Sequence, residues 1–361
     1  MFISNSIGFG GASKMLCFVA QNLAERGYGV SIINLHSTNG ADVFERNIDK
    51  KIKTIRAMDV PSGENKNLFR IKEIVNAAKA FDADVLIGFT TYPNMYAKIA
   101  GTILGIPSIM SERGDPSRTM GCGLHSRLAK WIIDRSKGGV FQTDGAMTFY
   151  GKGLQKRGTV IPNPIFINED VPCVPFEMRE KCVVSVGRLD NVQKRYDVML
   201  KAFKNFSDKH ADYVLKLYGI GDDEEKIHTW AKKFGIADKV LFMGLTKHSM
   251  RDMASCGIFL ITSDYEGISN SLLEAMAVGL PCVSTDHTPG GARLLIQDGE
   301  NGLLAPMGNA GALADAMCRF AEDEVLAKKC GENARDVVNR FEPKKIIDMW
   351  EKYVKIICGE F

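Results

Sequence analysis

The sequence predicts an α/β protein of two Rossmann-like domains, each built on a parallel sheet. Short apolar runs alternate with segments of helical period along the chain, and this alternation is typical of parallel sheets covered on both faces. It is interrupted at residues 160–180, where four prolines and little periodicity indicate a linker. Two such sheets would face each other across a cleft, and ligands would bind beyond the carboxyl ends of the strands.

The expected elements follow in chain order. The first strand lies in "MFISN" and looks clipped, and apolar positions from Met15 to Leu23 then follow one face of a helix. Further strands are expected at Val30–Asn34, Asp84–Phe89, Pro107–Met110, Gly139–Gln142, Cys182–Gly187, Tyr213–Tyr218, Val240–Met243, Gly257–Thr262 and Pro281–Ser284. We therefore expect an N-terminal domain over 1–163, a linker over 164–181, a C-terminal domain over 182–342, and a final helix at 343–361 that packs back toward the first domain.

Composition favours a cytoplasmic globular protein. Of 361 residues, 45% are apolar and 25% charged, no apolar run reaches membrane-spanning length, and no signal peptide is evident. The nine cysteines form no Cys-x-x-Cys pair, which favours free thiols. Charge is uneven: residues 1–163 hold 21 Lys and Arg against 13 Asp and Glu, and the remainder holds 25 against 30. The first half could face an anionic partner, or its basic surface could have no such role.

The glycine-rich stretch "SNSIGFGGASK" (4–14) precedes the first helix. It matches neither the dinucleotide fingerprint nor the P-loop, because Ser13 stands where each needs glycine. Gly10 and Gly11 would still let the backbone approach a ligand at a helix N-terminus. A simple strand-to-helix turn remains the alternative.

The stretch "VVSVGRLDNVQKRYDVML" (183–200) indicates an anion site. The strand ends at Gly187, and the period predicts Lys194 and Arg195 in the first turn of a helix, where cations oppose the macrodipole. A bound diphosphate that meets Arg188 and Lys194 would reverse that cost. Alternatively, Asp190 and Asp197 neutralise these cations.

Two glutamates, Glu266 and Glu274, flank a predicted helix start in "SDYEGISNSLLEAMAVG". The amides of a helix N-terminus bind anions, and a carboxylate can accept two hydrogen bonds from a vicinal diol, so a ribose suits Glu274 and a sugar ring suits Glu266. Two capping boxes, from Ser271 to Glu274 and from Ser263 to Glu266, would explain the same spacing structurally.

Other patterns predict no further site. Asp82 and Asp84 resemble an Asp-x-Asp metal motif, but polar residues at the end of a helix-to-strand loop explain them better. Asp222–Glu225 fits a solvated acidic helix start. The histidines form no metal-ligand spacing, and no nucleophile elbow is present, so we expect no metal, no cofactor and no hydrolase triad.

Several segments together resemble retaining family 4 glycosyltransferases, which have the GT-B fold. They are "VGRLDNVQKRYDVMLKAF", "LYGIGDDEEKI", "FMGL", "ITSDYEGISNSLLEAMAVGLPCVSTD" and "PGGARLLIQDGENGLLAP", with a looser match in "GFGGASKMLCFVAQNLAERGYGV". The Glu-x7-Glu spacing of Glu266 and Glu274 matches the family's hallmark. "IPSIMSERGDP" and "PGGARLL" resemble the subset that acts on amino sugars and polysaccharide repeat units.

The resemblance implies a nucleotide-sugar donor held by the C-terminal domain and transfer without a metal. Arg188 and Lys194 would bind the diphosphate, Glu274 the ribose, and Glu266 the region of the transferred sugar. The donor-binding set is then Gly10, Gly11, Gly187, Arg188, Lys194, Gly267, Ile268, Ser269, Asn270, Ser271 and Glu274. Where many members have a histidine near the reacting sugar, this chain has Glu112 and Arg113, which join the expected catalytic group of Glu266, Arg188 and Lys194. Arg195 also departs from the family, which often has glycine after the lysine.

We therefore expect a retaining, metal-independent hexosyltransferase for polysaccharide biosynthesis. It would move a hexose or N-acetylhexosamine from a UDP-sugar to a lipid-linked or polysaccharide acceptor, and it would contact no nucleic acid. The alternatives are a GT-B sugar-nucleotide epimerase and a non-catalytic nucleotide-sugar-binding protein. GalNAc, GlcNAc, galactose and glucose differ too little for the sequence to choose among them.

The basic first half also suggests peripheral contact with an anionic inner membrane. Residues 101–163 carry nine cations against four acids (Arg113, Arg118, Arg127, Lys130, Arg135, Lys137, Lys152, Lys156 and Arg157 against Glu112, Asp115, Asp134 and Asp144). The segment 125–137 could form a basic amphipathic helix at a lipid surface. We expect instead that Leu128, Trp131 and Ile132 pack into the domain while the charges act without them.

Overall fold

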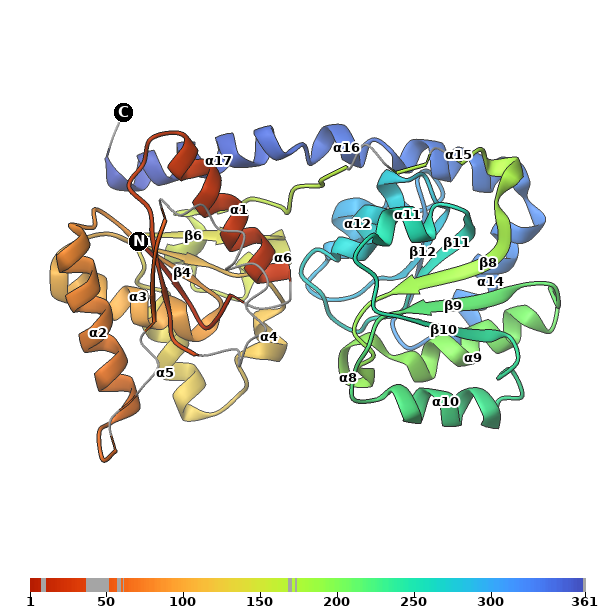
Figure 1. The fold of residues 1–361 in the computed structure, drawn as a ribbon, viewed down its shortest axis with the longest axis horizontal. Helices are drawn as coiled ribbons and strands as arrows, with labels where there is room; N and C mark the ends of the chain where they lie inside the picture. The colour runs from red at the N-terminus through yellow and green to blue at the C-terminus, as the bar shows by residue number, and fades with distance from the viewer. Residues whose placement is uncertain are drawn as a thin grey trace. The chain divides into compact units, whose positions relative to one another are not determined.

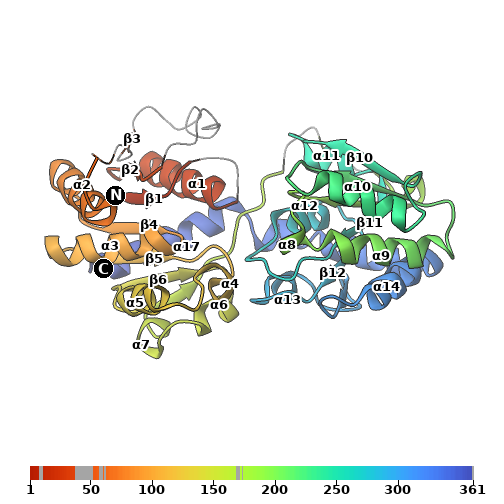
Figure 2. The same ribbon diagram turned by 90° about the horizontal axis from the view of Figure 1, so that it is seen from below.

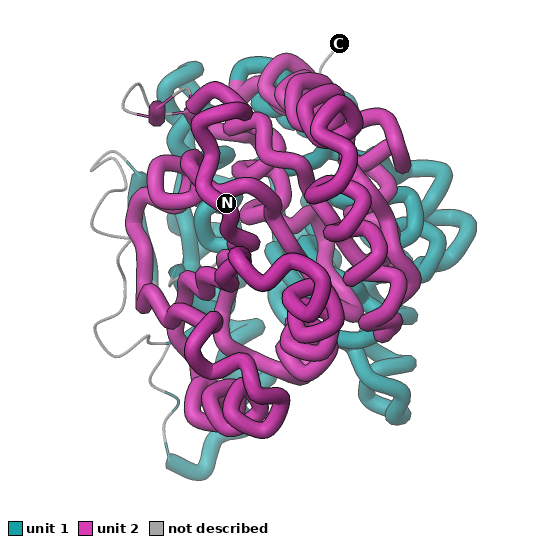
Figure 3. Tube along the Cα trace, turned by 90° about the vertical axis from the view of Figure 1, so that its right-hand side faces the viewer, with its two compact units in different colours: residues 1–163, 344–361 teal, residues 164–343 magenta. Residues whose placement is uncertain are grey.

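The computed structural model describes residues 1–7, 11–36, 52–56, 60, 62–167, 171–172 and 174–359. The chain forms two compact units, Met1–Asn163 with Lys344–Phe361, and Pro164–Pro343 (Figure 3). Each unit holds one parallel sheet between helices (Figures 1 and 2). The predicted class, two α/β domains with parallel sheets, is confirmed.

The sheet of the first unit has seven strands in the order β3-β2-β1-β4-β5-β6-β7. All its pairings are parallel, and the central strands are buried along their length, as near-continuous apolar runs predict. The strands are β1 (Phe2–Ser4), β2 (Ser31–Asn34), β3 (Lys53–Arg56), β4 (Leu86–Phe89), β5 (Ser108–Ser111), β6 (Gly138–Phe141) and β7 (Gly158–Val160). The helices are α1 (Gly11–Glu25), α2 (Lys66–Phe81), α3 (Thr91–Leu104), α4 (Pro116–Thr119), α5 (Leu124–Ile133), α6 (Asp144–Thr148) and α7 (Lys152–Gln155).

The C-terminal helix α17 (Pro343–Cys358) packs on the first unit through an apolar stripe. Trp350 is fully buried and stacks on Phe89, with ring centroids 5.9 Å apart. The hydroxyl of Tyr353 accepts a hydrogen bond from the Gly139 N–H at 2.7 Å and donates one to the Arg157 carbonyl. These contacts anchor the end of the chain to β4 and β6.

The sheet of the second unit has six parallel strands in the order β10-β9-β8-β11-β12-β13. They are β8 (Glu180–Val186), β9 (Val214–Tyr218), β10 (Val240–Gly244), β11 (Cys256–Ile261), β12 (Cys282–Thr285) and β13 (Leu303–Ala305). The helices are η2 (Phe176–Met178), α8 (Asn191–Lys194), α9 (Tyr196–Ser207), α10 (Glu224–Lys233), α11 (Ser249–Met253), α12 (Asn270–Ala277), α13 (Gly291–Leu295), α14 (Ala310–Glu322), α15 (Glu324–Ala334) and α16 (Val337–Arg340). From β8 the chain runs outward to β9 and β10, and it then returns to β11, which lies on the other side of β8. Because the order reverses between β8 and β11, a ligand site is expected beyond their carboxyl ends.

Residues 164–181, which the sequence suggests as a linker, are grouped with the second unit. Ile165 is 4% exposed, lies in a core cluster of that unit, and donates its N–H to the Phe341 carbonyl at 2.9 Å. In the glycine-rich turn, α1 begins at Gly11, while Gly10 lies outside the described residues.

Candidate functional site

A largely buried ion pair joins the ends of β8 and β11. Nζ of Lys194, the last residue of α8, lies 2.5 Å from Oε1 of Glu266, which follows β11. Only 16% of the lysine side chain and 12% of the glutamate side chain are exposed. Ser263 donates a second hydrogen bond to the same oxygen at 3.0 Å. Burial alone would raise the pKa of Glu266, but Lys194 outweighs it and, aided by His287 and Ser263, holds that pKa below its ordinary value.

Local sequence explains how Lys194 reaches this position. Asp190 caps α8 by accepting the Val192 N–H at 2.9 Å, and Lys194 ends this single turn. Lys194 does lie in this single turn, at its carboxyl end, whereas the expectation is wrong for Arg195, which is the cap between α8 and α9. Its side chain passes over Gly187, where an added Cβ would lie 3.3 Å from the Cε of Lys194.

The other two cations of this stretch have different surroundings. Arg195 has a left-handed backbone (φ 54°) and bonds Asp264 at 2.8 Å and Asp197 at 2.9 and 3.0 Å. Arg188 is 66% exposed, with its guanidinium 3.3 Å from carboxylate Oδ2 of Asp190. Neutralisation by Asp190 and Asp197 thus applies to Arg188 and Arg195, whereas Lys194 pairs with Glu266.

The turn that carries Glu266 is fixed by loops from both neighbouring strands. The Glu266 N–H donates to the Thr288 carbonyl at 2.8 Å, and the Gln193 side chain donates to the Tyr265 carbonyl at 3.0 Å. Gly291 lies so close to this turn that an added Cβ would be 1.7 Å from the carbonyl oxygen of Gly267. Only glycine fits there, so the sequence "PGGAR" is needed to hold the turn in place.

His287 follows β12 at the same edge, and sequence reasoning passed over it. It is 1% exposed and lies against the backbone of Thr288. Burial lowers the pKa of His287; Lys194 lowers it further, and the charge of Glu266 opposes both. The ring is therefore neutral near pH 7. The sequence signal for His287 was its position two residues after an apolar run that forms β12, because ligand sites lie beyond the carboxyl ends of such strands.

Helix α12 presents its N-terminus at this edge. Its cap is Ser269, whose Oγ accepts the Leu272 N–H at 3.4 Å, so the box from Ser271 to Glu274 does not form the cap. Glu274 instead accepts a hydrogen bond at 2.7 Å from Ser249 on α11. In the second proposed box, the Ser263 hydroxyl donates to the Glu266 carboxylate, so this pair links two side chains and caps no backbone N–H. Neither capping box therefore explains the two glutamates, and the positive end of the α12 dipole lies at the turn from Gly267 to Ser271.

Glu112 and Arg113 follow β5 in the first unit and are 2% and 9% exposed. Glu112 accepts hydrogen bonds from the Tyr150 hydroxyl at 2.8 Å and the Arg113 N–H at 3.0 Å. Arg113 donates to Asn163 at 2.7 Å, while its Nε and Nη1 have no partner among the described residues. Burial raises the pKa of Glu112 and lowers the pKa of Arg113 to about 9.

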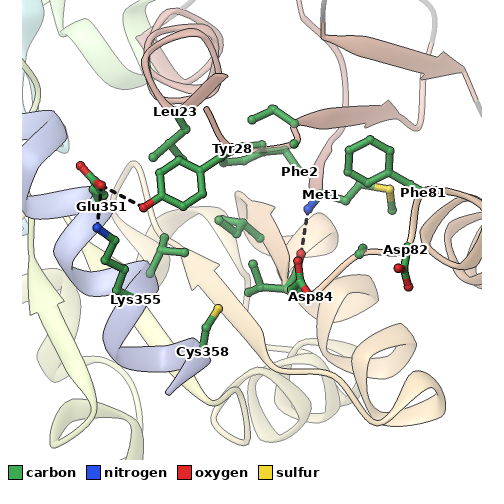
Figure 4. A pocket seen from close by; sticks show the side chains of 16 residues that line it. Met1, Phe2, Leu23, Tyr28, Phe81, Asp82, Asp84, Glu351, Lys355 and Cys358 are labelled. Carbon is green, nitrogen blue, oxygen red and sulfur yellow. Dashed lines mark hydrogen bonds and ion pairs between the residues drawn. The ribbon is translucent and has the colours of Figure 1, made fainter. Parts of the chain in front are cut away.

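The Asp-x-Asp pair lies at the amino-terminal edge of the first sheet, as Figure 4 shows. Asp82 is the left-handed C-cap of α2, which agrees with the loop interpretation. With Asp84 it lines a cavity of about 320 Å³, across from Glu351, which accepts a hydrogen bond from the Tyr28 hydroxyl at 2.9 Å and pairs with Lys355.

In the second unit, the structure brings together three potential metal ligands that sequence spacing did not reveal. Atoms of His210, Cys318 and Glu322 lie within 4.8 Å of one another, and the histidine pairs with the glutamate at 3.2 Å. Cys318 and Glu322 lie at the end of α14, apart from the ends of β8 and β11.

Comparisons with known proteins agree with the predicted glycosyltransferase resemblance. Residues 168–337, which lie mostly in the second unit, match the family model of glycosyl transferases group 1. The predicted resemblance and the GT-B fold are both confirmed.

Relatives match over nearly the whole chain. An uncharacterized glycosyltransferase of Haemophilus influenzae is 27% identical over 97% of this chain and 98% of its own. The GalNAc-alpha-(1->4)-GalNAc-alpha-(1->3)-diNAcBac-PP-undecaprenol alpha-1,4-N-acetyl-D-galactosaminyltransferase of Campylobacter jejuni is 24% identical over 98% of this chain and 97% of its own. Among solved structures, HepE from Anabaena, in complex with UDP and glucose, has a TM-score of 0.84 at 19% identity and covers 98% of each chain.

Proposed function

We propose that this protein is a retaining, metal-independent glycosyltransferase that moves a hexose or N-acetylhexosamine from a UDP-sugar to a lipid-linked or polysaccharide acceptor in the cytoplasm. The observation that carries the proposal is the buried Lys194–Glu266 pair at the point where the strand order reverses. Isolated charges are costly to bury, so a paired lysine and carboxylate at a ligand edge suit a substrate that is itself both anionic and rich in hydroxyls.

The donor diphosphate would bind between Lys194, Arg188 and the N-terminus of α12. Arg188 is largely exposed and held only by contacts of 3.3 Å to Gln193 and Asp190, so it can turn toward a phosphate at little cost. The amides from Gly267 to Ser271 add the positive end of the helix dipole. The structural role of Gly187 is to leave room for the Lys194 side chain.

The two glutamates would hold the two sugars of the donor. Glu274, oriented by Ser249, is suited to accept hydrogen bonds from the ribose diol. Glu266 is ionised and fixed by Lys194 and Ser263, so it can accept a hydrogen bond from a hydroxyl of the transferred sugar. Lys194 would thereby connect the carboxylate at the sugar to the phosphate of the leaving group.

Transfer breaks the bond between the anomeric carbon and the β-phosphate oxygen, and that electron pair leaves with UDP. Lys194, Arg188 and the α12 amides stabilise the charge that develops on the diphosphate, which is the electrostatic task a metal performs in other transferases. The acceptor hydroxyl attacks the same face of the sugar that UDP leaves, and a donor phosphate oxygen takes the hydroxyl proton. This step retains the anomeric configuration.

The acceptor would be bound through the first unit, where Glu112 and Arg113 follow β5, while Gly11, which begins α1, would contact the donor. Support for a lipid-linked acceptor comes from the Campylobacter relative, whose name contains PP-undecaprenol. Support for UDP comes from the Anabaena structure, which contains UDP and glucose. Glu112 and Arg113 are proposed to position the acceptor or the reacting sugar.

A donor panel tests the proposal. Thermal shift with UDP-, GDP- and ADP-sugars should show stabilisation by UDP-sugars, and UDP release should rise when an undecaprenyl-diphosphate-linked saccharide is added. The anomeric configuration of the product, read by NMR, should match that of the donor. Preference for another nucleotide, or an inverted product, would overturn the corresponding part of the proposal.

A further inference from the structure

Helix α5 carries exposed apolar side chains on its outer face, contrary to the expectation that they pack into the domain. Leu124, Leu128 and Trp131 are 81%, 55% and 54% exposed, whereas Ala129 and Ile133 are the buried residues of this helix. Ala129 and Ile133 thus form the inward face of α5. The helix packs against α3, and Ile133 lies in a core cluster with Met110 of β5 and Phe141 of β6. Figure 2 shows α5 at the surface of the first unit, near α6 and α7.

Cations occupy the same outer face. At 3.6 residues per turn, Leu124, Arg127, Leu128 and Trp131 fall within an arc of about 100° on α5, and Arg135 follows two residues after the helix ends at Ile133. We call these five residues the α5 outer face. The Arg135 guanidinium lies 3.6 Å from the centre of the Trp131 ring. A tryptophan with an adjacent arginine is suited to the headgroup level of a membrane, where the ring is partly buried and the cation stays with phosphates.

The exposed charge of residues 101–163, the segment that contains α5, is more one-sided than the sequence counts suggest. In residues 101–163, Glu112 and Asp115 are buried, and Asp134 pairs with Lys130 at 2.8 Å. Asp144 is the one carboxylate that is exposed in this segment, whereas seven cations are exposed: Arg118, Arg127, Arg135, Lys137, Lys152, Lys156 and Arg157. Packing and pairing therefore neutralise or bury three of the four acids and leave seven of the nine cations exposed.

We propose that the α5 outer face is a docking surface for an anionic phospholipid bilayer, into whose headgroup layer Leu124, Leu128 and Trp131 insert. Basic residues beside exposed apolar ones are the chemistry of an interfacial helix, and a protein partner would need no excess of cations. No helix among the described residues is long and apolar enough to cross a membrane, so contact would be peripheral. The inference rests on the proposed function in one respect, since a lipid-linked acceptor gives the enzyme a reason to dock.

The test uses the full chain and vesicles of phosphatidylcholine with about one third phosphatidylglycerol, compared with pure phosphatidylcholine. Wild-type protein should co-sediment with the anionic vesicles at low salt and be released by about 0.5 M salt, where screening shortens to a few ångströms. Trp131 fluorescence should shift to the blue and be quenched by brominated lipid, and Trp131→Phe should abolish both signals.

Matched variants assign the binding to this face. Reversing Arg127 and Arg135 to glutamate should weaken partitioning by about 25-fold or more, at about fivefold for each cation removed. Lys72→Glu with Lys79→Glu, the same charge change on α2, should weaken it much less. Leu124→Ser (81% exposed in the wild type) should reduce binding, and Leu68→Ser, at a leucine on α2 that is 67% exposed, should not.

Several results would overturn the inference. They are no binding to anionic vesicles at low salt, equal losses in the α5 and α2 variants, or a dimer that the α5 variants disrupt, which would assign the face to a second copy. Stabilisation by UDP, measured without vesicles, reports on the donor site separately. A variant that loses vesicle binding but keeps this stabilisation therefore tests the docking surface and not the proposed reaction.

Discussion

Replacing Lys194 by methionine removes the counter-ion of a buried carboxylate while keeping most of the side-chain volume. Two unit charges 2.5 Å apart attract by about 7 kcal/mol at an effective dielectric constant of about 20, and desolvation offsets much of this. Removing one partner of a buried pair costs about 3–5 kcal/mol. Because 16% and 12% of the two side chains remain exposed, we expect a loss near the lower end, about 3 kcal/mol.

The loss should depend on pH in a defined direction. In the wild type the pKa of Glu266 is depressed, so its stabilising contribution is present above its unfolded pKa and is lost as pH falls through the folded pKa. In Lys194→Met, burial dominates and the folded pKa of Glu266 rises above the unfolded value. The variant is then penalised at neutral pH, and the penalty disappears as the carboxyl is protonated. The stability difference should therefore shrink between pH 7 and about pH 4.

Hydrogen exchange of peptides from β8 and β11 is the appropriate assay, because the two units can unfold separately. Glu266→Gln alone should also lose stability, and the double variant should lose clearly less than the sum of the two single losses. Additivity within about 0.5 kcal/mol, or a loss independent of pH, would show that the two residues are not coupled and refute the reasoning.

Four further predictions concern the same site. Glu274→Ala should raise KM for the UDP-sugar with little change in kcat, because a ribose contact is equal in ground and transition states, and a kcat effect larger than the KM effect would contradict that role. Arg188→Ala should lower kcat by about 10²–10³-fold without loss of folded protein, since the side chain is 66% exposed; near-normal turnover would remove it from the site. His287→Asn should weaken the decline of stability on the acid side of the pH profile, because a buried neutral histidine with a lowered pKa costs stability as pH falls below its unfolded pKa; an unchanged profile would contradict this. EDTA should leave turnover intact, and strong inhibition would point again to a metal, with Asp82 and Asp84 or the His210 cluster as candidates.

The sequence was sufficient for most of the fold. Each of the nine strands predicted after "MFISN" overlaps an observed strand, because buried parallel strands are continuous apolar runs. The strands it did not predict are β3, β7 and β13, and all three lie at sheet edges. An edge strand has one neighbour and needs fewer apolar residues, so its sequence is less distinctive; β7 is only half-buried throughout.

The sequence singled out Lys194, Glu266 and Glu274, which the structure places at one edge, but it did not predict their contacts. Lys194 and Glu266 are 72 positions apart, and their contact exists only because β8 and β11 are adjacent. Ser249 on α11 and His287 after β12 also come from separate parts of the chain. On α5 the period was recognised but the wrong face was assigned inward, since Leu128 and Trp131 are more apolar than Ala129, which is the residue that fits against the core.

The central claim is that the edge formed by β8, β11 and α12 binds and activates a UDP-sugar. The most direct measurement is transfer from radiolabelled UDP-GalNAc, UDP-GlcNAc, UDP-galactose and UDP-glucose to an undecaprenyl-diphosphate-linked saccharide, by wild type and by Glu266→Gln. We predict that one of these sugars appears in the lipid fraction with equimolar UDP release, and that Glu266→Gln still binds UDP but loses most of the transfer. If the wild type neither binds nor consumes any UDP-sugar, or if Glu266→Gln transfers at the wild-type rate, the account is contradicted.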